Sequence, residues 1–117
     1  MNAQSLADDN AGILAFDEEV IDYGNVAYKS DGTKTFTFTN VGKSPVVIAD
    51  VKTSCGCTVA SKPTKAIMPG ESSEISVNYK TSKAGPFSKT ITVISNAKEN
   101  RKVLKIKGKV LEAPSKS

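Results

Sequence analysis

The sequence predicts an all-β domain, an immunoglobulin-like β-sandwich of about seven antiparallel strands. Apolar and polar residues alternate with a period of two along most of the chain, and turn-forming residues interrupt that alternation at regular intervals. No stretch keeps the 3.6-residue period of a helix. We expect residues 13–112 to form the domain, with residues 1–12 as a disordered leader and residues 113–117 as a disordered tail.

Four strands are expected in the first half. Residues 13–16 form the first, and residues 20–24 form the second after an acidic break. A turn at Asp31-Gly32 leads into residues 33–40, where phenylalanines occupy one face and threonines the other. Residues 46–53 form the fourth strand, and their apolar start predicts burial on both faces at that end.

Three strands are expected in the second half, at residues 74–80, 87–95 and 102–111. Alternation assigns one side chain in two to the core. The core-facing residues predicted in these strands are Ile75, Val77, Tyr79, Ile91, Val93, Leu104, Ile106 and Val110.

The composition excludes several classes of protein. Sixteen lysines and arginines against 12 acidic residues give a net charge of +4, too weak by itself to indicate nucleic acid. With no tryptophan and 6% aromatic residues, the chain is poorly supplied for base stacking, so we expect no nucleic-acid partner. No apolar run approaches the ~20 residues that cross a bilayer, and the first residues lack the pattern of an export signal.

The cysteines stand one residue apart, as Cys55-Gly56-Cys57, in a chain without histidine. Residues two apart in a straight strand are separated by about 6.6 Å, near the upper limit for a disulfide, so a bridge needs a bend that Gly56 permits. Such a tight ring is strained and easily reduced. Cys55, Gly56 and Cys57 are therefore a candidate redox or disulfide site.

Other interpretations of this unit remain open. Small thiols pack well at the end of a buried strand, and Gly56 can mark a bulge there. Cys55 and Cys57 can also bind a metal, with Cu(I) favoured over zinc because histidine is missing, although we expect no resident metal or other cofactor. Covalent modification or an intermolecular disulfide is a further alternative. A catalytic cysteine needs a base that the chain does not offer, so no catalytic residue and no enzyme is expected.

A row of lysines lies on the last strand. Lys105, Lys107 and Lys109 share the face opposite the core-facing residues. They are a candidate stripe for a polyanion. The alternative is a solvent-facing strand, guarded by lysines against aggregation if it lies at a sheet edge.

The chain resembles a bacterial family, domain of unknown function 1573. Its most specific match is residues 51–59, around Ser54-Cys55-Gly56-Cys57-Thr58. Supporting matches are residues 22–26, 36–42, 68–71, 77–79, 83–87 and 95–96. The resemblance implies an immunoglobulin-like fold related to the major-sperm-protein and Hydin type, in secreted or lipid-anchored proteins, often from Bacteroidetes. It implies no reaction.

We therefore expect a non-enzymatic interaction or structural module of the periplasm or cell envelope. Its partner would be another envelope protein, and an export signal or lipid anchor would have been removed from the native form. A thiol redox or Cu(I)-handling protein that uses the Cys-Gly-Cys pair is the alternative function, and the cytoplasm is the alternative location.

Overall fold

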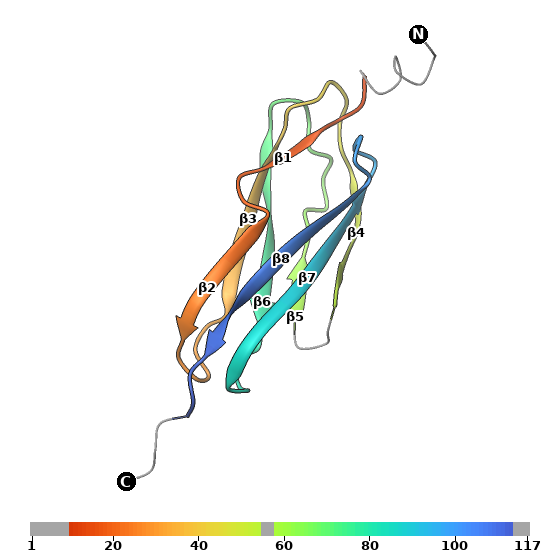
Figure 1. Cartoon of the computed structure of the whole chain (residues 1–117). Coiled ribbons are helices and arrows are strands. Elements are labelled where there is room, and N and C mark those ends of the chain that lie inside the picture. Colours follow the sequence, from red (N-terminus) through yellow and green to blue (C-terminus); the bar gives the residue numbers. More distant parts are fainter. Residues whose placement is uncertain (1–9, 55–57, 114–117) are drawn as a thin grey trace.

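The computed structural model describes residues 10–54 and 58–113. Two sheets of four strands each pack face to face (Figure 1). The described residues contain no helix. The strands are β1 (Leu14–Phe16), β2 (Val20–Val26), β3 (Thr33–Asn40), β4 (Ile48–Thr53), β5 (Thr58–Ser61), β6 (Ser72–Tyr79), β7 (Gly85–Ser95) and β8 (Arg101–Val110).

The first sheet has the strand order β1-β3-β6-β5, and the second has β2-β8-β7-β4. The chain changes sheet between β1 and β2. The Asp17 N–H still donates to the Thr37 carbonyl of the first sheet at 2.9 Å, whereas the Glu19 carbonyl already accepts from Lys105 of the second sheet at 2.9 Å. The crossing at residues 17–19 places β1 and β2 one after the other along the same side of the sandwich (Figure 1).

The all-β, immunoglobulin-like prediction is confirmed, with three differences in detail. The described chain has eight strands, because Thr58–Ser61 forms β5, which is too short for its alternation to be recognised. β2 and β8 pair in parallel, whereas the other pairs are antiparallel. The expected burial on both faces near residue 46 is wrong: Val46 and Ile48 are buried, and Val47 between them is exposed.

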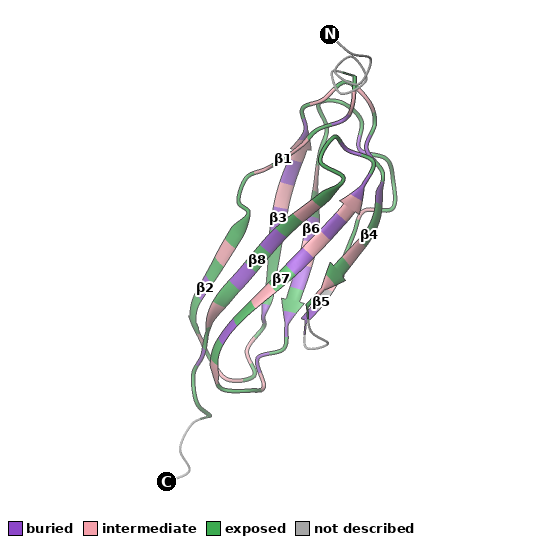
Figure 2. Cartoon of the chain, turned by 45° about the vertical axis from the view of Figure 1, so that its right-hand side comes forward, coloured by how far each residue is buried: buried purple, intermediate pink, exposed green. Residues whose placement is uncertain are grey.

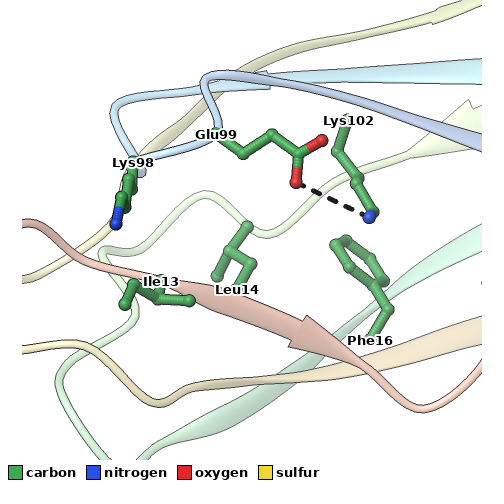
Figure 3. A pocket seen from close by; sticks show the side chains of 6 residues that line it. All are labelled: Ile13, Leu14, Phe16, Lys98, Glu99 and Lys102. Atoms are coloured by element: carbon green, nitrogen blue, oxygen red, sulfur yellow. Dashed lines mark ion pairs between the residues drawn. The ribbon is translucent and has the colours of Figure 1, made fainter.

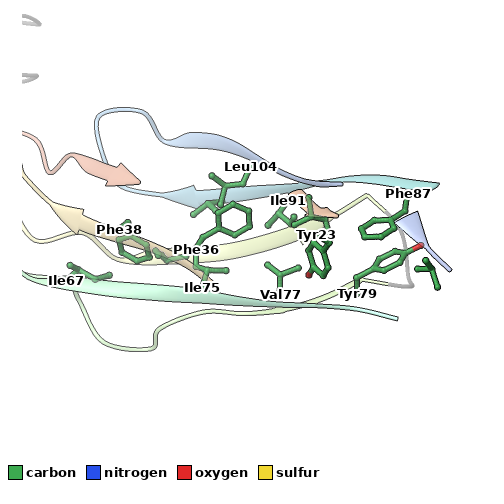
Figure 4. Packing of buried hydrophobic residues seen from close by; sticks show 14 residues of the cluster. Tyr23, Phe36, Phe38, Ile67, Ile75, Val77, Tyr79, Phe87, Ile91 and Leu104 are labelled. Atoms are coloured by element: carbon green, nitrogen blue, oxygen red, sulfur yellow. The ribbon is translucent and has the colours of Figure 1, made fainter. Parts of the chain in front are cut away.

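The core lies between the sheets and follows the alternation (Figure 2). The predicted core-facing residues of β6, β7 and β8 are all buried. Phe36 and Phe38 of β3 complete the centre of the core (Figure 4). Burying one such side chain contributes on the order of 1.5–3 kcal/mol, so burial of this cluster is a large favourable contribution to folding.

Three aromatic rings close the core at the end away from β1 (Figure 4). The rings of Tyr79 and Phe87 stack with centroids 3.9 Å apart, and Tyr23 meets Phe87 edge-on at 5.3 Å. The Tyr23 hydroxyl donates to the Gly32 carbonyl at 2.6 Å, which satisfies the one polar group of this buried side chain. Burial, assisted by the negative charge of Asp31, raises the pKa of Tyr23 to about 12.

Candidate functional site

A groove of about 430 Å³ opens on the side of the sandwich where the chain changes sheet. One wall is formed by β1 and the residue before it. The other is formed by the hairpin that joins β7 to β8 (Figure 3). The lining residues are Ile13, Leu14, Phe16, Lys98, Glu99 and Lys102.

Asn40, at the end of β3, holds the first wall in place. Its side chain is fully buried, and its amide makes four hydrogen bonds to backbone groups. The side-chain oxygen accepts from the N–H of Ile13 at 3.1 Å and of Gly42 at 2.9 Å. The amide nitrogen donates to the carbonyls of Ser44 at 2.8 Å and Ile67 at 2.9 Å. One amide therefore fixes the chain that enters β1 against two loops.

Close backbone packing adds to this anchoring. A Cβ atom on Gly42 would overlap the Ala11 carbonyl oxygen and the Ile13 nitrogen. The two walls are also joined directly, because the Lys98 N–H donates to the Gly12 carbonyl at 2.8 Å. The groove is therefore a fixed feature of the fold rather than a gap between independent segments.

The interior of the groove is apolar and its rim is charged. Leu14 and Phe16 are half-buried, and the Phe16 ring rests against Phe38 with centroids 5.1 Å apart. On the opposite rim the Lys102 ammonium lies 2.6 Å from a Glu19 carboxylate oxygen and 3.6 Å from one of Glu99. The hydrogen bond to Glu19 raises the pKa of Lys102, against the effect of partial burial, and the charge of Glu99 adds to the increase.

The backbone of β1 is unpaired along the groove side. Ile13 and Asp17 bond toward the β3 side: the Ile13 carbonyl accepts from the N–H of Val41, just after β3, and the Asp17 N–H donates to the Thr37 carbonyl. Because successive residues of a strand point their polar groups to opposite sides, Leu14 and Phe16 point theirs away from β3. Within the described residues nothing bonds to them.

The first half of β8 has a similar free edge. Lys105 and Leu111 donate to the β2 side, to the carbonyls of Glu19 and Val26. Alternation therefore turns the N–H and carbonyl of Val103 to the same side. β2 begins only at Val20, opposite Lys105, so Val103 lies beyond its end. The Val103 side chain is 55% exposed.

Two other strand edges, those of β2 and β4, are protected. β2 is interrupted by a register shift between Asp22 and Asn25, where the Gly24 N–H donates to the Asp22 carboxylate at 2.8 Å. β4 has a register shift between Ile48 and Asp50, and the Asp50 carboxylate accepts from the Val51 N–H at 2.8 Å. Bulges and side-chain caps of this kind prevent a second chain from adding to a sheet edge. The edges around the groove lack them in the part of the chain that the structure describes.

A side-chain hydrogen bond joins β4 to β5 on the opposite side of the sandwich. The Thr53 hydroxyl donates to the Thr58 carbonyl at 3.1 Å. Cys55, Gly56 and Cys57, which join these two strands in the chain, lie outside the described residues, so the redox, disulfide and metal interpretations stay predictions. Thr58 beside them is buried, and its hydroxyl has no hydrogen-bond partner among the described residues.

The predicted lysine row lies on the outer face of the second sheet. Lys105, Lys107 and Lys109 are exposed, as the alternation predicted. β8 lies between β2 and β7, however, so the suggestion that these lysines guard a sheet edge is wrong. Position within a sheet depends on pairing between distant segments, which alternation along one strand does not report.

Sequence reasoning missed the groove. One signal for it was available at Lys102, which shares the core-facing side of β8 with Leu104 and Ile106. A charged residue on that side indicates that the core-facing side of β8 is no longer in the core at Lys102. In the described residues, no cluster of three or more histidine, cysteine, aspartate or glutamate side chains can hold a metal ion. No helix there is long and apolar enough to cross a membrane.

Comparison with known proteins gives a family and a fold. The model of a family described as "Protein of unknown function (DUF1573)" matches residues 14–110. No curated protein matches the sequence. A protein of unknown function from Porphyromonas gingivalis W83 is similar in structure, with a TM-score of 0.77 and 18% identity over 92% of this chain and 51% of that one. The chain thus spans about half the length of that protein.

Two further solved structures share the fold. The ASH/PapD-like domain 7 of human CEP192 has a TM-score of 0.73 and 10% identity, over 90% of this chain and 89% of that one. WR4, a major-sperm-protein family member of C. elegans, has a TM-score of 0.54 and 12% identity, over 84% of this chain and 97% of that one. At these identities the likeness establishes an immunoglobulin-like sandwich.

Proposed function

The chain belongs to the DUF1573 family of proteins of unknown function, and we propose that it is a non-enzymatic interaction module. Its groove between β1 and the β7–β8 hairpin accepts an extended segment of a partner protein. The observation that carries this proposal is the pair of unprotected strand edges beside an apolar groove, in a sandwich whose β2 and β4 edges are protected.

The mode of binding follows from the geometry of β1. Leu14 and Phe16 offer two N–H groups and two carbonyls to a strand that lies along their edge. A strand added in this way gains main-chain hydrogen bonds, and alternate side chains supply specificity by filling pockets. An apolar side chain of the partner would occupy the groove against Leu14 and Phe16. The partner is thus defined by an extended conformation with an apolar anchor residue.

The proposed location is the periplasm or cell envelope, with another envelope protein as the partner. This rests on the resemblance of residues 51–59 and the supporting motifs to secreted and lipid-anchored members of the family. Fractionation of cells that carry the native protein tests the location. Recovery in the cytosolic fraction alone would contradict it.

Peptides selected from a random-peptide phage library on the immobilised protein test the groove directly. Ile13→Glu places a charge at the rim, where Ile13 is 38% exposed and the cost to folding is small. Leu111→Glu is the matched control, because Leu111 is 42% exposed and follows β8 at the other end of the sandwich. We expect Ile13→Glu to weaken peptide binding at least tenfold, about 1.4 kcal/mol, and Leu111→Glu to leave it unchanged.

Amide chemical shifts of the peptide complexes locate the site. Shifts confined to residues 13–16 and 98–103 support the proposal. Peptides that shift other regions, or bind equally to wild type and Ile13→Glu, would overturn it. The double variant Cys55→Ser/Cys57→Ser separates this function from the thiol alternative, because groove binding should survive the loss of both sulfurs.

A further inference from the structure

The outer face of the second sheet carries positive charge in a regular array. Lys105, Lys107 and Lys109 project from β8 at every second residue, which spaces them about 6.6–6.8 Å apart along the strand. Because β8 is flanked by β2 and β7, the row runs along an interior strand of the sheet rather than along its border.

Hydroxyl groups stand beside two of these lysines. The register of β7 and β8 sets Thr90 opposite Lys105 and Ser88 opposite Lys107, and both side chains are exposed. The Lys105 N–H donates to the Glu19 carbonyl on the β2 side, so Lys105 and Thr90 form a non-hydrogen-bonded pair of the β7–β8 ladder. Lys107 and Ser88, two residues further along each strand, form a pair of the same kind. Side chains of such pairs lie closest together, with Cβ atoms about 4.5–5.5 Å apart.

Little negative charge offsets the row. On the β2 side the residues opposite Lys105, Lys107 and Lys109 are Val20, Asp22 and Asn25. Asp22 is the acidic member, and its carboxylate already accepts from the Gly24 N–H. Among the described residues the ion pairs are those of Lys102. The three ammonium groups of the row are therefore available to a ligand.

The first sheet shows that this charge is not spread over both faces. Its two central strands present hydroxyl and amide side chains outward, with Glu74 as the charged residue. The outward residues of β3 and β6 are Thr33, Thr35, Thr37, Thr39, Ser72, Glu74, Ser76 and Asn78. The lysine row is a property of one face.

We infer that the face formed by Lys105, Lys107 and Lys109 with Ser88 and Thr90 binds a linear acidic glycan. A row of ammonium groups attracts carboxylate, sulfate or phosphate groups that recur along an extended polymer. The neighbouring hydroxyls can bond sugar hydroxyls and acidic oxygens alike. The lysines and their register partners on β2 and β7 include no aromatic residue on which bases could stack, which favours a glycan over single-stranded nucleic acid.

Heparin serves as the acidic glycan probe, with dextran as the uncharged one. The test variant is Lys105→Gln/Lys107→Gln/Lys109→Gln. The matched control is Lys62→Gln/Lys65→Gln/Lys80→Gln, which removes the same three charges from exposed lysines outside β8. Thermal unfolding of each variant verifies folding.

We expect wild type and control to bind heparin, with an affinity that falls as salt rises, and the test variant to bind at least tenfold more weakly. Replacing three contacts should reduce the slope of log K against log salt by about 2. Equal losses in the two triple variants would show diffuse charge attraction and overturn the inference. Tighter binding of a (dT)20 oligonucleotide or of anionic vesicles than of heparin, or no heparin binding at low salt, would overturn it as well.

Discussion

The Lys102 ammonium lies 2.6 Å from the Glu19 carboxylate, and this pair joins the residue before β2 to the first half of β8. Glu19 also accepts the Lys105 N–H through its backbone, so one residue ties the sheet crossing to β8 twice. Because the Glu19 side chain is 55% exposed, Glu19→Gln should lower the free energy of unfolding by less than about 1 kcal/mol. Glu99→Gln should cost less still, since its distance to Lys102 is 3.6 Å.

Urea unfolding at low and high salt measures this pair. The difference between Glu19→Gln and wild type should shrink as salt screens the charges. An effect of Glu99→Gln larger than that of Glu19→Gln would contradict the assignment of Glu19 as the main partner.

Asn40 should be far less tolerant of substitution. Asn40→Ala leaves the N–H groups of Ile13 and Gly42 and the Ser44 carbonyl without this partner, while the Ile67 carbonyl keeps the Val46 N–H. We therefore expect a loss of about 2–4 kcal/mol in the free energy of unfolding. Asn78→Ala, on the exposed face of β6, is the control and should change stability by less than about 0.5 kcal/mol. Similar losses of stability for both variants in urea unfolding would contradict the role of Asn40 as the anchor of the groove.

Tyr23 should make stability fall in alkaline solution. Its pKa is about 12 in the folded protein and 10.0 ordinarily, so the unfolded chain loses the proton first as pH rises. The resulting stability is complete below pH 10 and is lost between pH 10 and 12, by at most about 2–3 kcal/mol. Tyr23→Phe should cost about 1–2 kcal/mol at neutral pH through the lost bond to Gly32.

Chemical unfolding at several pH values distinguishes the effect of Tyr23 ionisation from the effect of the lost hydrogen bond to Gly32. The variant should show a flatter decline than wild type above pH 10. Parallel declines of both proteins would mean that another group is responsible.

The mass of the intact protein, measured before and after thiol alkylation, tests the state of the two cysteines. If Cys55 and Cys57 are structural thiols, both should alkylate readily in protein purified without reductant, and no metal should add under native conditions with Cu(I) or Zn(II). Resistance to alkylation until reduction indicates a disulfide, and one retained metal that needs both sulfurs indicates a thiolate site. Either result would move the search for function to the Cys-Gly-Cys unit.

Alternation predicted the core because it is a local property. Phe36 and Phe38, and likewise Ile75 and Val77, are buried as expected from their spacing within a single strand. The role of Asn40, the last residue of the expected strand 33–40, was not predicted, because its partners Ile13 and Ile67 are distant in the sequence.

The candidate groove is non-local for the same reason. It forms where β1 and the β7–β8 hairpin, from the two ends of the chain, come together. The place of β8 between β2 and β7 also depends on pairing over the whole sequence. The residue pattern within a single strand predicts neither arrangement.

The parallel pairing of β2 with β8 has a mechanical consequence. Figure 1 shows the chain entering at one end of the sandwich and leaving at the other. A pull on the two ends therefore drags β2 and β8 past each other along their length and loads the hydrogen bonds of the pair together in shear. A hairpin pulled from its open end would instead unzip one bond at a time. We expect single-molecule stretching to show one high-force rupture, lowered when Val26→Pro removes a backbone donor in β2.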